Sequence, residues 1–201
     1  MYKPKVAILL LAAGNSSRLG QPKQLLKWKS SNLLQHAIDT VKKVQSDSVI
    51  LVLGANYQEI ISEINTNSIH VVNNKTWQNG LGNSIAVGVN NIKKVFPETE
   101  AILIILADQP LITEVYLSKM ISEFNICKKQ IIATAYKNNR LGVPALFDKE
   151  YFEELMQLNN DEGAKHIIKN HEQVVSYIET SQMFSDIDTL ESYEILYKQH
   201  H

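Results

Sequence analysis

The chain has 201 residues, of which 44% are hydrophobic and 20% are charged, a balance that is typical of soluble globular proteins and excludes a disordered chain. The formal net charge is −1, so the protein as a whole does not attract nucleic acid or an anionic membrane. The single cysteine, Cys127, excludes an internal disulfide and a thiolate metal cage, and we interpret it as a packing residue.

No charged-then-apolar leader precedes the first apolar segment, and no apolar run is long enough to span a bilayer. These observations predict a cytoplasmic protein that binds neither membranes nor nucleic acid. We assign no role to the terminal pair His200–His201.

Short apolar runs alternate with longer amphipathic stretches along the chain. Residues 6–11 form a continuous apolar run before a glycine-containing turn, which is typical of a buried parallel strand. Residues 33–44 carry apolar side chains at helical spacing. The same criteria predict strands at 48–53, 69–72, 101–107, 130–136, 143–147 and 174–178, and helices at 58–64, 82–95, 113–124, 151–158, 163–169 and 190–197.

Two of these elements carry local signals. Thr113 is predicted to cap helix 113–124, with Glu114 in its first turn, where negative charge is favoured. Pro144 confines strand 143–147 to an edge of the sheet or to an irregular section. The alternation of strands and helices predicts one domain over residues 1–201, a three-layer α/β/α sandwich around a Rossmann-like, mainly parallel sheet. Ligands bind beyond the carboxyl ends of the strands in such sheets.

The loop over residues 11–26, after the first strand, contains two glycines and the cations Arg18 and Lys23. Backbone N–H groups in a glycine-containing loop form an anion site, and cations neutralise phosphate oxygens. Neither the G-x-G-x-x-G nor the Walker motif is present. The residues alone leave two interpretations open, a phosphate loop and a plain strand-to-helix connection with solvated cations.

Two acidic segments contain candidate metal ligands. Asp108 follows the most apolar strand at the carboxyl edge of the predicted sheet, where it can cap a turn or bind Mg²⁺. Residues 186–193, Asp-Ile-Asp-Thr-Leu-Glu-Ser-Tyr, form a helix start by pattern alone, with Asp188 or Thr189 as the cap and Glu191 in the first turn.

The string Leu-Ala-Ala-Gly-x-Ser-x-Arg-x-Gly-x-Pro-Lys-x-Leu-Leu over residues 11–26 resembles the signature of nucleotidyltransferases that build activated nucleotides. Among these it resembles the MobA-like family, and the molybdenum cofactor cytidylyltransferases in particular. The resemblance implies that the loop wraps the triphosphate, with Lys23 stabilising the phosphoryl group under attack and Arg18 supporting the phosphates. It also implies that Asp108, within Asp-Gln-Pro, and Asp188 bind Mg²⁺, with Asp186 in support.

The motifs that resemble the family occur in the family's order from residue 6 to residue 193, and they include the segments that bind each of the two substrates. The segment Asn74–Ser84 resembles the family's tryptophan-glycine-serine stretch, in which we interpret Trp77 as a core or lid anchor rather than a residue that stacks on the base. Asn160 and Lys165 replace a glycine and an arginine of the family pattern, which implies looser phosphate recognition, and we interpret His166 as a surface or packing residue. The implied nucleotide-binding residues are Leu11, Ala12, Ala13, Gly14, Arg18, Lys23, Gly80 and Ser84, and the implied acceptor-binding residues are Gly142, Pro144, Asp161, Gly163 and Lys165.

Ala13 stands where relatives that use CTP carry alanine and those that use GTP carry glycine, which favours a pyrimidine. The resulting hypothesis is Mg²⁺-dependent transfer of CMP from CTP to molybdopterin or its metal-loaded form, with release of pyrophosphate. The N-terminal half would bind the nucleotide and the C-terminal half the acceptor. Two alternatives remain: a sugar phosphate or other phosphorylated metabolite as acceptor, or a non-catalytic partner in maturation of a molybdenum hydroxylase. Such a hydroxylase, or its chaperone, is the expected protein partner.

Overall fold

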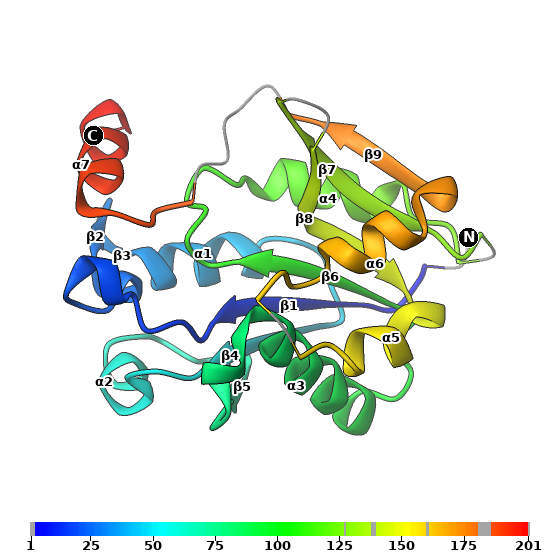
Figure 1. The fold of residues 1–201 in the computed structure, drawn as a ribbon, viewed down its shortest axis with the longest axis horizontal. Coiled ribbons are helices and arrows are strands. Elements are labelled where there is room, and N and C mark those ends of the chain that lie inside the picture. Colours follow the sequence, from blue (N-terminus) through cyan, green and yellow to red (C-terminus); the bar gives the residue numbers. More distant parts are fainter. Residues whose placement is uncertain (1–2, 127, 138–139, 160, 181–185, 201) are drawn as a thin grey trace.

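A seven-stranded sheet lies at the centre of the computed structural model, which describes residues 3–126, 128–137, 140–159, 161–180 and 186–200 (Figure 1). Cys127, Asn160 and His201, which the sequence analysis discussed, lie outside the described residues. In spatial order the strands are β5 (His70–Asn73), β4 (Ser48–Leu53), β1 (Val6–Ala12), β6 (Ala101–Leu106), β8 (Arg140–Asp148), β7 (Ile131–Tyr136) and β9 (Val175–Glu179).

The strand β1 runs parallel to both of its neighbours, β4 and β6. Ile8, near the middle of β1, pairs with Val49 on one side and with Leu103 on the other. Every residue of β1 is buried, as its continuous apolar run predicts, because both faces of the sheet are covered. β8 runs antiparallel to β6 and β7, and β9 runs parallel to β7. The predicted mainly parallel sheet is therefore confirmed.

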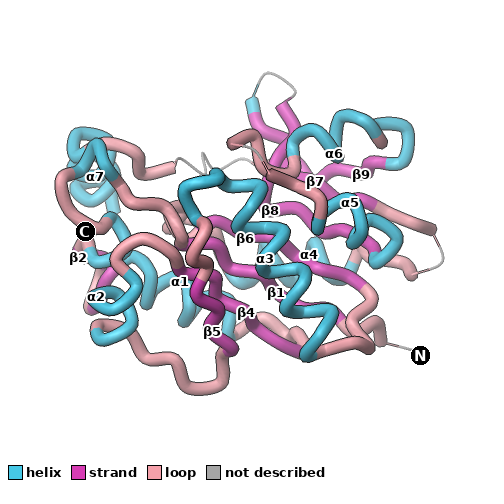
Figure 2. The backbone as a smooth tube through the Cα atoms, turned by 60° about the horizontal axis from the view of Figure 1, so that its bottom comes forward, coloured by secondary structure: helices cyan, strands magenta, loops and turns pink. Residues whose placement is uncertain are grey.

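Helices cover both faces of the sheet and complete the three predicted layers. In Figure 1 α3, α5 and α6 lie in front of the sheet, and α1 and α4 lie behind it. In Figure 2 α7, β2 and α2 lie at the end of the molecule opposite to the N-terminus. The helices are α1 (Leu33–Lys42), α2 (Tyr57–Ser62), α3 (Gly80–Val95), α4 (Glu114–Ser122), α5 (Phe152–Met156), α6 (Lys165–Asn170) and α7 (Leu190–His200).

Alternate residues of β1 contribute to two separate hydrophobic cores, because side chains of a strand point to opposite faces of the sheet. Ile8 and Leu10 pack with side chains of α1 and α4 on one face. Ala7 and Leu9 pack with side chains of α3, α5 and α6 on the other face. The amphipathic helices therefore bury their apolar sides on a strand that is apolar on both faces, which fixes β1 and the loop that follows it.

The strand β8 corrects the prediction that Pro144 lies at an edge of the sheet. β8 is an interior strand between β6 and β7. The register between β7 and β8 shifts at Ala133/Thr134, and pairing with β6 begins only at Ala145. Pro144 thus lies at the irregular section that was the other predicted alternative, where its missing N–H breaks no ladder bond. The hydroxyl of Thr134 donates a hydrogen bond to the Pro144 carbonyl at 2.7 Å.

A third, smaller apolar cluster joins the C-terminal segment to the residues after the first loop. Trp28 and Leu33 pack with Ile187 and Leu196, and the Trp28 and Tyr197 rings lie edge to face at 6.1 Å. The cluster includes part of the hairpin formed by β2 (Lys27–Trp28) and β3 (Ser31–Asn32), which is too short for sequence periodicity to predict. This cluster positions the start of α7, where two of the candidate aspartates lie.

The predicted helices and strands are all present, with ends that differ by up to three residues. Thr113 caps α4 as predicted and accepts a hydrogen bond from the Tyr116 N–H at 3.2 Å. At the start of α7, Thr189 and Ser192 bond each other's backbone N–H groups at 3.1 Å, a reciprocal cap that confirms the predicted helix start. Among the described residues, no helix combines the length and the apolar character needed to cross a membrane.

Candidate active site

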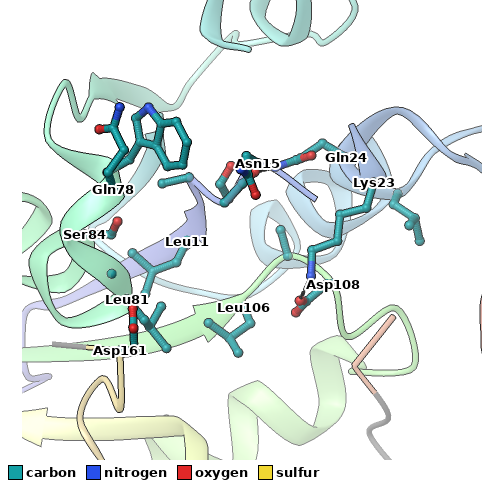
Figure 3. A pocket seen from close by; sticks show the side chains of 17 residues that line it. Leu11, Asn15, Lys23, Gln24, Gln78, Leu81, Ser84, Leu106, Asp108 and Asp161 are labelled. Carbon is teal, nitrogen blue, oxygen red and sulfur yellow. Dashed lines mark hydrogen bonds and ion pairs between the residues drawn. The ribbon is translucent and has the colours of Figure 1, made fainter. Parts of the chain in front are cut away.

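A cavity of about 360 Å³ opens at the carboxyl ends of β1 and β6, where ligands bind in open α/β sheets (Figure 3). Most of its lining comes from three segments, namely the loop after β1, residues 77–84 before and at the start of α3, and the residues at the end of β6, and Leu33 and Asp161 complete it. Its lining consists of Leu11, Ala12, Ala13, Gly14, Asn15, Lys23, Gln24, Leu33, Trp77, Gln78, Gly80, Leu81, Ser84, Leu106, Ala107, Asp108 and Asp161. The cavity therefore brings together residues that are far apart in the sequence.

The loop after β1 turns twice through the left-handed region of backbone conformation. Ser16 has φ 55° and Gly20 has φ 68°, and the short 3₁₀ helices η1 (Ser17–Leu19) and η2 (Lys23–Leu25) follow these turns. Glycine adopts this region without a steric penalty, whereas a residue with a Cβ atom needs support from its surroundings. The loop therefore folds back on itself, and η2 returns Lys23 to the cavity (Figure 3).

Lys23 is the centre of the charged cluster at this site. Its ammonium group forms an ion pair with Asp108 and lies 3.3 Å from the Ile187 carbonyl and 3.5 Å from Asp188 Oδ1. Burial alone lowers the pKa of Lys23, but the charges and hydrogen bonds of Asp108 and Asp188 outweigh it and raise the pKa above its ordinary value. Lys23 is therefore charged throughout the neutral pH range.

Asp108 retains one oxygen that can bind a cation. Oδ2 accepts from Lys23, whereas Oδ1 is buried and has no hydrogen-bond partner among the described residues. A buried carboxylate oxygen without a partner is costly, so it is a site at which a ligand restores a lost interaction. No group of three or more His, Cys, Asp or Glu side chains within the described ranges is arranged to hold a metal ion.

Asp186 connects the C-terminal segment to the sheet. The side-chain amide of Gln109 donates to Asp186 at 2.7 Å and to the Tyr136 hydroxyl at 3.2 Å, and Tyr136 in turn donates to the Val143 carbonyl. Asp186 as a whole residue is exposed to solvent, but its carboxylate end lies among these groups. Desolvation of the carboxylate is the larger cause that raises the pKa of Asp186, and the charge of Asp108 is the second. This network holds residues 186–188 beside Lys23.

Ser84 is oriented by a second polar network, at the start of α3. The buried Asn74 side chain donates to Ser84 Oγ at 3.1 Å and to Asn83 Oδ1 at 3.0 Å. Because Ser84 Oγ accepts this bond, its own hydrogen is available as a donor. Ser84 lines the cavity and is 3% exposed, so its hydroxyl is fixed in place.

Trp77 lines the cavity and packs tightly over Gly54, at the end of β4. A Cβ atom on Gly54 would lie 2.5 Å from Trp77 Cβ and 2.8 Å from the Ala13 carbonyl. Trp77 is half-buried and anchors this wall of the cavity, in agreement with its predicted role as a core or lid anchor.

We expect Gly54→Ala to lower the free energy of unfolding by about 1–3 kcal/mol, because the new methyl group overlaps backbone as well as side-chain atoms. Both contacts belong to residues that line the cavity, so ligand affinity falls together with stability. Urea denaturation measures the first effect. Gly14→Ala is the matched control, since a Cβ atom there meets no atom within 4 Å; equal stability losses in the two variants would contradict the steric argument.

The structure places the sequence-predicted residues in two groups. Leu11, Ala12, Ala13, Gly14, Lys23, Gly80, Ser84, Asp108 and Asp161 line the cavity, whereas Arg18, Gly142, Pro144, Gly163, Lys165 and Asp188 do not. The Arg18 guanidinium lies 3.9 Å from Asp188, and its side chain is 74% exposed. Gly142 and Pro144 are buried on β8, Lys165 and His166 are exposed on α6, and Asp161 is the one predicted acceptor residue in the lining.

Four residues that position the site were not predicted from the sequence: Gln24, Asn74, Gln109 and Tyr136. Gln24, Asn74 and Gln109 are buried polar residues, and each donates the hydrogen bonds that position a neighbouring site group. Gln109 lies within the Asp-Gln-Pro triplet, so its position next to Asp108 was a signal that could have drawn attention to it. Asn74 is the first residue of the segment 74–84 that resembles the family's stretch, whereas Gln24 and Tyr136 carry no local pattern that distinguishes them.

Comparison with solved structures defines the class of fold. The structure of Rv0371c from Mycobacterium tuberculosis H37Rv aligns with a TM-score of 0.87 and 26% identity, covering 98% of this chain and 100% of that chain. The same protein in complex with manganese aligns with a TM-score of 0.82 and 24% identity, covering 96% and 98%. A nucleotidyl transferase from Methanothermobacter thermautotroptrophicus aligns with a TM-score of 0.82 and 18% identity, covering 97% of each chain. The fold is that of the Rossmann-like nucleotidyltransferases.

Sequence comparison identifies the family within this class. Residues 8–174 match the MobA-like NTP transferase domain, and the chain belongs to this family. The relatives include the nicotine blue oxidoreductase of Paenarthrobacter nicotinovorans, 28% identical with 94% of each chain covered. They also include the purine catabolism protein PucB of Bacillus subtilis, 26% identical with 98% of each chain covered.

Proposed function

We propose that the protein transfers a nucleoside monophosphate, CMP from CTP, to the terminal phosphate of molybdopterin or its metal-loaded form, and releases pyrophosphate. The observation that carries this proposal is the pairing of Lys23 with Asp108 at one end of a cavity between the glycine-containing loop and β6. A cation and a carboxylate at this edge match what phosphoryl transfer requires, which is positioning and charge neutralisation.

The reaction needs no covalent protein nucleophile. An oxygen of the acceptor phosphate attacks the α-phosphorus of the nucleotide, a new P–O bond forms, and the bond from the α-phosphorus to the bridging oxygen of pyrophosphate breaks. The attacking phosphate is already ionised, so no protein base is required. Lys23 neutralises charge on the phosphoryl oxygens during this step, and the loop backbone over residues 12–15 positions the phosphates. Arg18, exposed beside Asp188, neutralises the outer phosphates.

A divalent cation, Mg²⁺ in our proposal, fits the carboxylates at this site. Asp108 and Asp188 both reach Lys23, and Asp108 Oδ1 has no protein partner among the described residues. Together they offer the small number of carboxylates that Mg²⁺ uses in nucleotide sites. When bound, the ion neutralises phosphate oxygens of the triphosphate. The manganese complex of the Mycobacterium tuberculosis relative is consistent with a divalent cation.

The preference for CTP rests on the wall of the cavity at Ala13. Ala13 is buried and lines the cavity, and its carbonyl accepts a hydrogen bond from the Ala55 N–H at 3.0 Å, so its backbone is held and the methyl group cannot move away from a base. A methyl group there takes space that a purine needs, which supports a pyrimidine. The Ser84 hydroxyl offers a fixed donor to a carbonyl or ring nitrogen of the base.

The acceptor site is proposed to lie on the C-terminal half of the single domain. Asp161 belongs to the C-terminal half and lines the cavity. Gly142 and Pro144 lie on β8, and Gly163 and Lys165 lie before and at the start of α6. The choice of molybdopterin rests on the resemblance of the loop and acidic motifs to the cytidylyltransferases. A molybdenum hydroxylase or its chaperone is the proposed recipient of the product.

Pyrophosphate release by the purified protein tests the proposal directly. With Mg²⁺ and molybdopterin we expect release with CTP and little with GTP, ATP or UTP. Activity with another nucleotide would retain the class of reaction and overturn the base assignment. Release with a sugar phosphate in place of molybdopterin would overturn the acceptor.

Two further experimental outcomes would favour a different function for the protein. Nucleotide binding without pyrophosphate release for any acceptor would favour a non-catalytic partner in hydroxylase maturation. One relative is named as an oxidoreductase, so an oxidation–reduction reaction without nucleotide transfer is the outcome that would favour its class of reaction.

A further inference from the structure

Gln24, which directly follows Lys23 in the chain, is a buried polar side chain. It is 4% exposed, although glutamine is rarely buried to this degree. Its side-chain amide donates to the Ala12 carbonyl at 2.9 Å and to the Gly14 carbonyl at 2.9 Å. Both hydrogens of one amide group are thus used to hold two backbone carbonyls of the loop after β1.

The carbonyl between these two is held as well. The Ala55 N–H donates to the Ala13 carbonyl at 3.0 Å. In a trans peptide the N–H points opposite to the C=O. The carbonyls of Ala12, Ala13 and Gly14 point to these protein donors. The N–H groups in the same three peptide units, those of Ala13, Gly14 and Asn15, therefore point in the opposite direction, away from these donors. These residues line the cavity, where N–H groups are the donors that a phosphate requires.

Gln24 also connects this backbone to Lys23. Ser16 Oγ donates to Gln24 Oε1 at 3.4 Å and accepts a hydrogen bond from the Lys23 N–H at 3.0 Å. Ser16 has φ 55°, a conformation that a serine keeps only when its surroundings hold it. Gln24 therefore connects the start of the loop to the left-handed turn at Ser16. Ser16 in turn binds the backbone N–H of Lys23.

We propose that Gln24 is a positioning residue that holds the loop after β1 in the conformation that receives the triphosphate. It acts through the backbone of residues 12–15 and through Lys23, because its side-chain amide donates to the Ala12 and Gly14 carbonyls. The inference rests on the proposed function, since it requires that the cavity binds a nucleoside triphosphate. It predicts that nucleotide affinity depends on the two N–H groups of this amide.

Nucleotide binding by variants tests this inference without the reaction. Gln24→Met keeps the volume of the side chain and removes both donors, leaving the Ala12 and Gly14 carbonyls unpaired. We expect its Kd for CTP, measured by calorimetry, to rise about tenfold or more, as expected when two hydrogen bonds that organise a site are lost. Amide hydrogen exchange over residues 13–16 should become faster. Gln58→Leu, on the exposed surface of α2, is the matched control and should leave both quantities unchanged.

Turnover separates positioning from a loss of folded protein. A variant that only folds less well has fewer active sites, so kcat falls while the KM values for nucleotide and acceptor stay the same. Positioning instead raises KM for the nucleotide and leaves KM for the acceptor unchanged. Ser16→Ala, on a partly exposed loop outside the three hydrophobic cores, should shift nucleotide affinity in the same direction by a smaller factor.

Failure of the role proposed for Gln24 can be distinguished from failure of the proposed function. No CTP or other triphosphate binding by the wild-type protein would overturn the proposed function. Tight binding by the wild type and equal binding by Gln24→Met and Ser16→Ala would overturn the role of Gln24 alone. A fall in melting temperature for Gln24→Met with an unchanged Kd would reduce Gln24 to a residue that contributes to stability.

Discussion

Replacing Lys23 with alanine is expected to lower kcat for pyrophosphate release by about 10²–10³-fold, the usual effect of removing a preorganised group that stabilises transition-state charge. The ammonium group is fixed by Asp108, Asp188 and the Ile187 carbonyl, so its position is set before a substrate arrives. Its pKa is raised, so no loss of activity from deprotonation of Lys23 is expected below its ordinary value of 10.5. Steady-state kinetics with CTP and molybdopterin measure the effect.

Stability separates the chemical role of Lys23 from its structural one. The side chains of Lys23 and Asp108 are 19% and 15% exposed, so Lys23→Ala leaves a largely buried carboxylate unpaired and lowers the melting temperature. The double variant Lys23→Ala/Asp108→Asn removes that charge and should regain stability without regaining activity. Lys119→Ala, on the exposed side of α4, is the control for loss of a lysine. Near-normal kcat for Lys23→Ala would contradict the proposed mechanism.

The sequence predicted those parts of the fold that depend on local pattern. The continuous apolar run of β1 and the helical spacing of α1 each reflect which faces are buried, and the two hydrophobic cores use these side chains as expected. Thr113 and Thr189 cap their helices because capping depends on residues that are close in the sequence. The loop after β1 and Asp108 were placed at the same edge because parallel strands end there together.

The position of β8 in the sheet could not be predicted in the same way. The pattern of residues 143–147 indicates a strand but says nothing about its neighbours, and Pro144 argued for an edge. The register shift opposite Thr134 lets the proline occupy an interior strand. That shift is a property of the pair of strands, so neither strand shows it alone.

Polar residues that position others through long-range contacts were also missed. Gln24 holds carbonyls that are ten and twelve residues earlier, and Gln109 reaches Asp186 across 77 residues of chain. A single polar residue has no periodicity, so its burial is decided only by tertiary packing. The resemblance to a family indicated which residues carry the chemistry, whereas the structure adds the residues that orient them.

Asp108→Asn is expected to lower kcat by at least about 10²-fold at saturating nucleotide, because in the proposed mechanism Asp108 holds the divalent cation that supplies several kcal/mol of charge stabilisation. Asparagine has nearly the same shape and keeps an oxygen, so the change tests charge rather than packing. Asp188→Asn should have a smaller effect, since the Asp188 side chain is 55% exposed and that of Asp108 is 15% exposed. Activity measured as a function of Mg²⁺ and of Mn²⁺ concentration shows which of the two variants loses more activity.

Binding of Mn²⁺ in the presence of CTP, followed by electron paramagnetic resonance, tests Asp108 independently of turnover. We expect weaker Mn²⁺ binding for Asp108→Asn and unchanged binding for Asp39→Asn, a control on the exposed side of α1. In Asp108→Asn the Lys23 ammonium loses its closest carboxylate, which lowers the pKa of Lys23. Lost activity together with wild-type Mn²⁺ binding would therefore assign Asp108 to the orientation of Lys23 and would remove it from the metal site.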